Sequence, residues 1–147
     1  RKSQNELDKY SLVAITSIYG VELLEDNVER CKERLFKIYS DWYNSISRGQ
    51  INEKLFNCVQ FVLSKNIIHG DALTLKAIGE SEEPIVFSEW SFTQNMLKRR
   101  CFAFDDLLKN EAIKETPLFS DLGDDVILPR TIEEFPLVHY LELADNA

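Results

Sequence analysis

Short β-rich segments in the first part of the chain alternate with long helical segments, and this alternation limits the fold more than any other feature. Residues 17–23 and 66–71 are rich in apolar and β-forming side chains, and each run ends in or next to a carboxylate, Glu22 or Asp71. A third apolar run covers residues 84–87. Because strands separated by amphipathic helices indicate βαβ units, the sequence predicts an α/β fold with a mainly parallel sheet flanked by helices.

Three segments have apolar side chains at helical spacing. The first covers residues 4–15, and the third runs from residue 51 to about residue 65. Between them, an apolar stripe predicts a helix of about five turns. This stripe consists of Val28, Cys31, Leu35, Ile38 and Trp42.

The pattern is weaker after residue 90. It predicts helices over residues 104–114 and 136–141 and a short edge strand over residues 125–129. We therefore interpret residues 1–147 as one domain, in which residues 1–90 hold the site-bearing strands and residues 91–147 form a helical, acidic part. The length of 147 residues suits a single domain.

The composition excludes several classes of protein. Hydrophobic residues make up 44% of the chain and charged residues 29%, which is typical of a globular domain. No apolar run is long enough to span a bilayer, and no signal peptide is visible, so we expect no membrane association. Three cysteines without a CxxC pair and only two histidines predict neither a disulfide framework nor a metal site. A reducing, cytoplasmic location is the expectation.

The charge is unevenly distributed along the sequence. Residues 1–80 carry 11 basic and 11 acidic side chains, whereas residues 81–147 carry 6 basic and 14 acidic ones. The whole net charge of −8 therefore comes from the second part. A chain that binds nucleic acid unaided is expected to present a basic face, and this sequence does not.

The two carboxylates at the ends of the predicted strands suggest a ligand. In an open parallel sheet, ligands bind outside the carboxyl ends of the strands. An ionised carboxylate there can accept hydrogen bonds from ribose hydroxyls or from the amino group of adenine. Glu22 and Asp71 together would suit a cofactor that contains adenosine. The alternative is that Glu22 is a solvated strand end and that Asp71 caps a turn after Gly70.

The same residues resemble those of the DNA adenine-N6 methyltransferases of restriction–modification systems. Residues 17–35 (SIYGVELLEDNVERCKERL) are similar to the second-strand motif of that family, and residues 66–73 (NIIHGDAL) to its third-strand motif. Residues 84–90 (PIVFSEW) and 96–108 (MLKRRCFAFDDLL) also resemble bacterial and phage members. The resemblance implies a Rossmann-like catalytic domain that uses S-adenosylmethionine and methylates DNA.

The resemblance also implies roles for particular residues. Glu22 would bind the ribose hydroxyls of S-adenosylmethionine, and Leu23 would pack against its adenine. Asp71 would accept from the adenine amino group, and the backbone N–H of Ala72 would donate to the adenine ring. An unrelated nucleotide-binding α/β domain is a further interpretation of the same strand-end carboxylates.

Two family motifs depart from the expected pattern. The five glycines include no GxG pair, so the glycine-rich motif of the first strand is absent and the chain resembles the later part of such a domain. Where the family has Asn/Asp/Ser-Pro-Pro-aromatic, this chain has Ser88-Glu89-Trp90. The resemblance implies that Ser88 binds the target amino group and that Trp90 stacks on the flipped base. The alternative is a polar strand end with a tryptophan packed on the sheet edge.

These departures leave two functions open. One is a truncated DNA methyltransferase that is inactive alone and reaches DNA through a parent protein or through missing regions. The other is a non-enzymatic, degenerate methylase module for interaction or oligomerisation. An unpaired sheet edge would favour a homodimer in that second case.

Overall fold

The computed structural model describes residues 3–47, 50–79, 83–106 and 131–145, which form a mixed α/β fold. The helices are α1 (Gln4–Thr16), α2 (Glu25–Ile46) and α3 (Glu53–Asn66), followed near the C-terminus by a 3₁₀ turn, η2 (Tyr140–Glu142). The strands are β1 (Gly20–Glu22), β2 (Ile67–Asp71), β3 (Lys76–Ala77), β4 (Val86–Thr93), β5 (Met96–Ala103), β6 (Thr131–Glu134) and β7 (Val138–His139).

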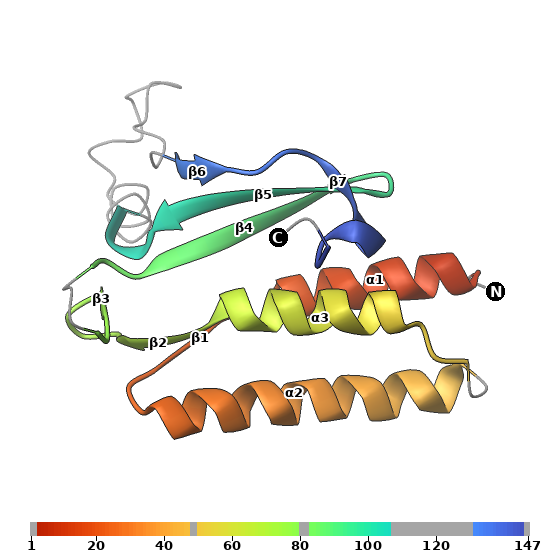
Figure 1. The fold of residues 1–147 in the computed structure, drawn as a ribbon, viewed down its shortest axis with the longest axis horizontal. Helices are drawn as coiled ribbons and strands as arrows, with labels where there is room; N and C mark the ends of the chain where they lie inside the picture. The colour runs from red at the N-terminus through yellow and green to blue at the C-terminus, as the bar shows by residue number, and fades with distance from the viewer. Residues whose placement is uncertain (1–2, 48–49, 80–82, 107–130, 146–147) are drawn as a thin grey trace, which may run out of the picture.

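These elements stack in layers with α3 at the centre. Figure 1 shows the antiparallel strands β4, β5 and β6 on one side of α1 and α3, and the long helix α2 on the other side. The pair β1 and β2 extends from the ends of α1 and α3. Helix α3 contacts α1, α2 and β4, so it forms the middle of the fold.

The predicted helices at residues 4–15 and 51–65 are confirmed, and local hydrogen bonds explain where they begin. Ser3 and Glu6 form a reciprocal capping box at the start of α1. The Asn52 side chain accepts from the backbone N–H of Leu55, 3.1 Å away, at the start of α3. These side chains satisfy backbone donors that the first helical turn leaves unpaired.

The predicted central helix forms as α2, and its apolar stripe packs on the core in the first half, where Val28 is buried and Cys31 and Leu35 are partly buried. In the second half, two tyrosines that lie outside the stripe pack on the core instead. Tyr39 and Tyr43 are buried, with 5% and 2% of their surfaces exposed, whereas Ile38 and Trp42 are 67% and 43% exposed. The two tyrosine rings pack against Phe56 of α3. Their hydroxyls also find polar partners, because Tyr39 Oη lies 2.9 Å from Ser11 Oγ and Tyr43 Oη accepts from Gln4 at 3.3 Å.

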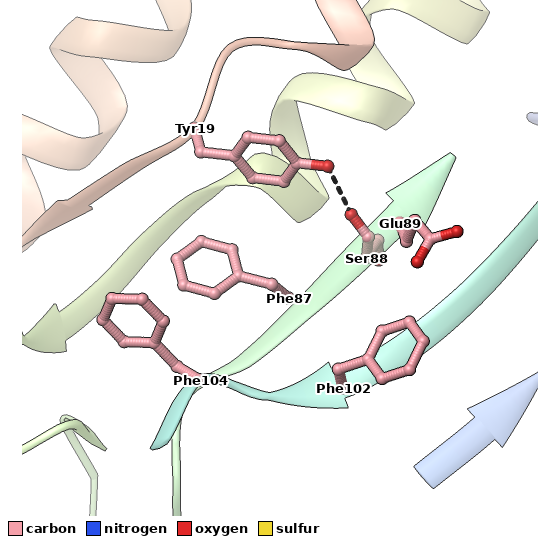
Figure 2. A pocket seen from close by; sticks show the side chains of 6 residues that line it. All are labelled: Tyr19, Phe87, Ser88, Glu89, Phe102 and Phe104. Carbon is pink, nitrogen blue, oxygen red and sulfur yellow. Dashed lines mark hydrogen bonds between the residues drawn. The ribbon is translucent and has the colours of Figure 1, made fainter. Parts of the chain in front are cut away.

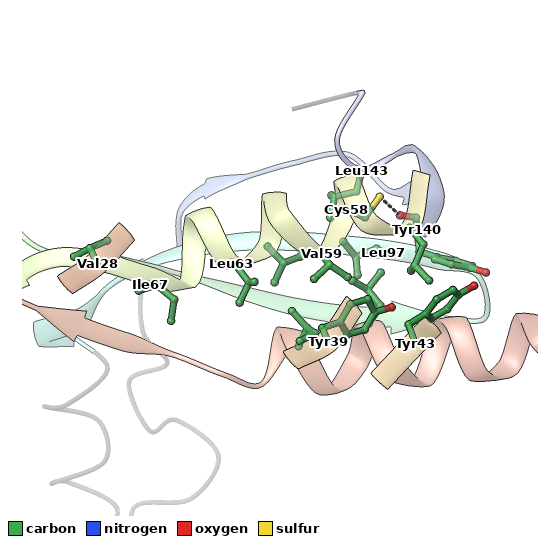
Figure 3. Close-up of a cluster of buried hydrophobic side chains, with 14 residues drawn as sticks. Val28, Tyr39, Tyr43, Cys58, Val59, Leu63, Ile67, Leu97, Tyr140 and Leu143 are labelled. Carbon is green, nitrogen blue, oxygen red and sulfur yellow. Dashed lines mark hydrogen bonds between the residues drawn. The ribbon is translucent and has the colours of Figure 1, made fainter. Parts of the chain in front are cut away.

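The hydrophobic core surrounds α3 (Figure 3). Its fully buried side chains come from α1, α3 and β5 and include Leu12, Leu55, Val59, Leu63 and Leu97. Burying a side chain of this size contributes about 1.5–3 kcal/mol. The C-terminal turn completes the core because Cys58 Sγ donates to the Tyr140 carbonyl at 3.0 Å. The core thus joins helices and antiparallel strands in one packed unit.

The predicted parallel pairing is confirmed for β1 and β2 alone. Gly20 pairs with Ile67 and Glu22 with His69 in a parallel register. Every other described strand pair is antiparallel, so the prediction of a mainly parallel sheet is wrong. The described strands also form two separate sheets, β1–β2–β3 and β4–β5–β6 with β7 beside β5.

The third apolar run lies at the start of a longer strand. Residues 84–87 were expected to form a short strand, but β4 continues to Thr93 and returns as β5 through a tight hairpin. The segment after residue 90 was expected to be helical, and this is wrong for β5, β6 and β7. The helix expected over residues 136–141 is instead β7 followed by the 3₁₀ turn.

Two further predictions fall partly or wholly outside the described residues. The helix predicted over residues 104–114 is seen at residues 104–106, and its remainder lies outside the described part of the chain. The edge strand predicted over residues 125–129 also lies outside it.

Gly70 of β2 allows the segment that leads into β4 to approach β2 closely, because glycine has no side chain. A Cβ atom at this position would lie 2.8 Å from Ile85 Cδ1 and 3.2 Å from the Lys76 carbonyl oxygen. Ile85 is fully buried here, and its backbone N–H donates to the Leu75 carbonyl at 3.0 Å. A larger residue at position 70 would therefore force the buried Ile85 side chain or the Lys76 backbone to move.

Candidate functional site

Glu22 and Asp71 lie at the same edge of the parallel pair. Glu22 is the last residue of β1 and is in register with His69, so Asp71 follows two residues further along β2. Two residues of an extended strand span roughly 6.6 Å, which places the two backbones within reach of one small ligand. The structure thus brings together the two predicted carboxylates.

Each carboxylate is positioned by hydrogen bonds within its own turn. Glu22 Oε1 accepts from the backbone N–H of Leu24 and from Asn27 Nδ2, both at 3.3 Å. Asp71 Oδ1 accepts from the backbone N–H groups of Leu73 and Thr74 at 2.8 and 3.4 Å. Asp71 therefore does cap a turn. Among the described residues, these bonds use Oε1 of Glu22 and Oδ1 of Asp71, so the second oxygen of each carboxylate could accept from a ligand.

The surroundings of this edge are apolar and exposed. Leu23 is 53% exposed and Ala72 is also exposed, so both predicted contact residues lie on the surface beside the carboxylates. His69 joins the two strand ends. Its Nε2 lies 2.9 Å from the Leu23 carbonyl oxygen, an atom that can only accept a hydrogen bond. The chain passing from β1 into α2 is thereby held against β2.

Ser88 and Trp90 lie elsewhere, inside β4 and not after the end of a strand. Ser88 is only 4% exposed, and its Oγ accepts from Arg99 Nε at 2.9 Å. Trp90 Nε1 donates to Asn66 Oδ1 at 2.8 Å, and its ring packs against Phe61. Both side chains face α3, so they share a face of β4 but do not approach the Glu22–Asp71 edge. Trp90 is thus packed, as in the alternative interpretation, but Ser88 lies inside β4 and is not a polar strand end.

Arg99 lies at the centre of a run of three basic residues, 98–100, and packs against aromatic rings. The three residues lie within β5, and the Arg99 guanidinium is 4.3 Å from the Phe135 ring centroid and 5.5 Å from that of Trp90. Such cation–π contacts stabilise an arginine at a partly buried position. The aromatic residues on neighbouring strands were the signal that could have located it.

The described residues offer little for other kinds of site. No group of three or more histidine, cysteine or acidic side chains in the described ranges is arranged to hold a metal ion. No helix among them is long and apolar enough to cross a membrane. The edge formed by Glu22 and Asp71 is therefore the candidate site on which a functional argument can be built. Comparison with family models, curated proteins and solved structures finds no match to this chain.

Proposed function

We propose that this chain is the part of an S-adenosylmethionine-dependent DNA adenine-N6 methyltransferase that binds the adenosine half of the cofactor. The observation that carries the proposal is the position of Glu22 and Asp71 at the same carboxyl edge of a parallel strand pair. The order of α1, β1, α2, α3 and β2 supports the proposal, because parallel strands connected through helices are the unit from which a Rossmann-like half-domain is built.

The chain's own residues would bind and orient the adenosine. The free oxygen of Glu22 would accept from the ribose hydroxyls, and that of Asp71 from the adenine amino group. Leu23 and the backbone of Ala72 would contact the adenine ring from the exposed loops beside them. The bound cofactor would supply the methyl group for transfer to adenine.

The proposal gives Ser88 and Trp90 no catalytic role. The Ser88 hydroxyl is buried against Arg99, and Trp90 is fixed between Asn66 and Phe61. Neither group is exposed enough to meet an extruded base without rearrangement of β4. The target base and the DNA backbone would be bound by other regions of a parent protein, in keeping with the acidic charge of this chain.

Calorimetric titration with modified nucleosides tests each carboxylate separately. Adenosine should bind more tightly than 2′-deoxyadenosine, because Glu22 would lose a hydroxyl donor, and more tightly than inosine, because Asp71 would lose the amino donor. Each lost charge-assisted hydrogen bond should cost about tenfold or more in affinity. Glu22→Gln should reduce the preference for adenosine over 2′-deoxyadenosine. Asp71→Asn should reduce the preference for adenosine over inosine.

Glu25→Gln is the matched control, because Glu25 is an exposed carboxylate in the first turn of α2. It should change neither preference. Equal binding of all three nucleosides, or a loss of both preferences in the Glu25 variant, would contradict the proposed site.

A second candidate function, oligomerisation, is supported by an apolar groove of about 390 Å³ between α1 and α2. Its rim exposes Tyr10, Ile38 and Trp42. A second copy is the occupant that this face suits. In a two-fold dimer, helix α2 of one copy would pack antiparallel to α2 of the other, with Ile38 at the centre of the contact. The exposed Arg34 of one copy would then lie beside Asp41 and Trp42 of the other.

Sedimentation analysis distinguishes the two candidates. If the groove is a dimer interface, the chain should be dimeric at micromolar concentration and Ile38→Glu should make it monomeric. Ile51→Glu is the control, because Ile51 is 64% exposed, close to the 67% of Ile38, but lies outside the groove. A monomeric parent chain would rule out the oligomerisation candidate.

A further inference from the structure

An aromatic pocket of about 330 Å³ lies between the residue that precedes β1 and the β4–β5 hairpin. Among the described residues it is lined by Tyr19, Phe87, Ser88, Glu89, Phe102 and Phe104. Figure 2 shows the four rings and the Glu89 side chain arranged around this space. The pocket shares no residue with the Glu22–Asp71 edge, and Tyr19 lies at the opposite, amino end of β1.

The walls of the pocket are fixed by contacts among themselves. The Phe87 ring meets Tyr19 and Phe104 edge to face, with centroids 5.4 and 4.8 Å apart. The Tyr19 hydroxyl donates to the Ser88 carbonyl at 2.6 Å. Burial and the charge of Glu89 raise the pKa of Tyr19, so the hydroxyl stays protonated at neutral pH and keeps this bond. A ligand would therefore enter a site whose shape already exists, which reduces the entropic cost of binding.

Glu89 is the acidic side chain among the described residues that line the pocket. Its Oε1 accepts from Arg100 Nη2 at 2.7 Å, and about half of its side chain is exposed. The carboxylate can accept a further hydrogen bond from an N–H group. Arg100 offsets part of its charge, but an anion placed against the carboxylate would still find no donor there and would be repelled. The aromatic rings add to this preference, since their faces attract positive charge and their edges pack well against other planar rings.

We propose that this pocket binds a planar heteroaromatic group that carries an amino substituent. The ring would pack between Tyr19, Phe102 and Phe104, and the amino group would donate to the Glu89 carboxylate. A volume of about 330 Å³ lies at the small end of the usual range for ligand pockets, roughly 300–1,000 Å³, and suits one or two fused rings. This site is independent of the proposed adenosine site.

Titration with three probes of equal ring size tests the predicted selectivity. The probes are 3-aminoquinoline, quinoline and quinoline-3-carboxylate, and calorimetry measures their affinities. We expect the amino probe to bind most tightly and the carboxylate probe most weakly. Glu89→Gln should reduce the ratio of the affinities for these two probes by about tenfold, because it removes the charge but retains an acceptor of the same shape. Glu133→Gln, an exposed acid on β6, should leave the ratio unchanged.

A second pair of variants tests the location. Phe104→Leu should lower the affinity for all three probes. Tyr10→Leu changes an exposed ring on α1 outside the pocket and should lower the affinity for none of them. Glu22→Gln and Asp71→Asn should also leave probe binding unchanged, which separates this site from the adenosine site. Equal affinities for the three probes, no effect of Phe104→Leu in a variant with a native circular dichroism spectrum, or no binding at all would overturn the proposal.

Discussion

At the residue scale, Asn66 connects three elements through one buried amide. It is fully buried at the end of α3, donates through Nδ2 to the Thr16 carbonyl at 3.2 Å and accepts from Trp90 at 2.8 Å. Thr16 is the last residue of α1 and Trp90 lies in β4. A single side chain thus satisfies a helix terminus and an indole N–H that would otherwise be left without a partner.

Replacing Asn66 by alanine should lower the free energy of unfolding for this reason. The substitution leaves a buried donor and a buried acceptor unpaired, so we expect a loss of about 2–4 kcal/mol in the free energy of unfolding. Urea denaturation measures it. Asn57→Ala, on the exposed side of the same helix, should cost no more than about 0.5 kcal/mol. Similar losses in the two variants would mean that the amide network contributes little.

At the element scale, the β4–β5 hairpin turns through a residue with an unfavourable backbone conformation. Thr93 pairs with Met96, so Gln94 and Asn95 form a two-residue turn. Gln94 has a φ of 57°, a region that glycine adopts readily and other residues adopt at a cost of about 1–2 kcal/mol. The fixed turn sets the register of β4 against β5, and hence the facing positions of Phe87 and Phe102 in the aromatic pocket.

Substitution by glycine should therefore have opposite effects on the free energy of unfolding at Gln94 and at Gln60. We expect Gln94→Gly to raise the free energy of unfolding by about 0.5–1 kcal/mol, because it removes the strained φ. Gln60→Gly, at an exposed position inside α3, should lower it by about the same amount, because glycine disfavours helix. Thermal or urea unfolding of the two variants provides the comparison, and destabilisation by both would show that the turn is not strained.

The elements differ in how well the sequence predicts them. The helices were predictable because their apolar spacing is local. The parallel pairing of β1 with β2 is not local, and it was predictable because helical segments separate the two strands in the sequence. The β4–β5 hairpin was missed because its turn lacks glycine and because three basic residues, 98–100, interrupt the apolar pattern. The Glu22–Asp71 edge was predictable from strand ends alone. The aromatic pocket was not, because Tyr19 and Phe102 are brought together only by tertiary packing.

At the scale of the whole molecule, the two sheets depend on one core. Leu97 of β5 is fully buried against the residues of α1 and α3, although it belongs to the sheet that does not contain β1 and β2. The main hydrophobic cluster of the described residues therefore includes a side chain from each sheet, Ile67 of β2 and Leu97 of β5. A chain organised in this way should unfold in a single cooperative step.

Leu97→Ala tests this cooperativity. We expect it to lower the free energy of unfolding by about 2–5 kcal/mol, as is usual when a core leucine is truncated. Ile132→Ala, on the exposed side of β6, should lower it by about 0.5 kcal/mol. In a Trp42→Phe background, Trp90 is the remaining tryptophan and reports on the β4–α3 contact. Its fluorescence and the helical circular dichroism signal should shift together. Two separate transitions would show that the hairpin unfolds independently of the helices.

The parallel register of Gly20 with Ile67 also has a kinetic consequence. All of α2 and α3 lies between these two residues, so pairing them closes a long loop, whereas the helices form from local contacts. We expect β1 and β2 to meet after the α2–α3 hairpin has folded, and Glu22 and Asp71 to come together late on the folding pathway. A ligand bound between them would then slow the unfolding of the chain and leave its folding rate almost unchanged.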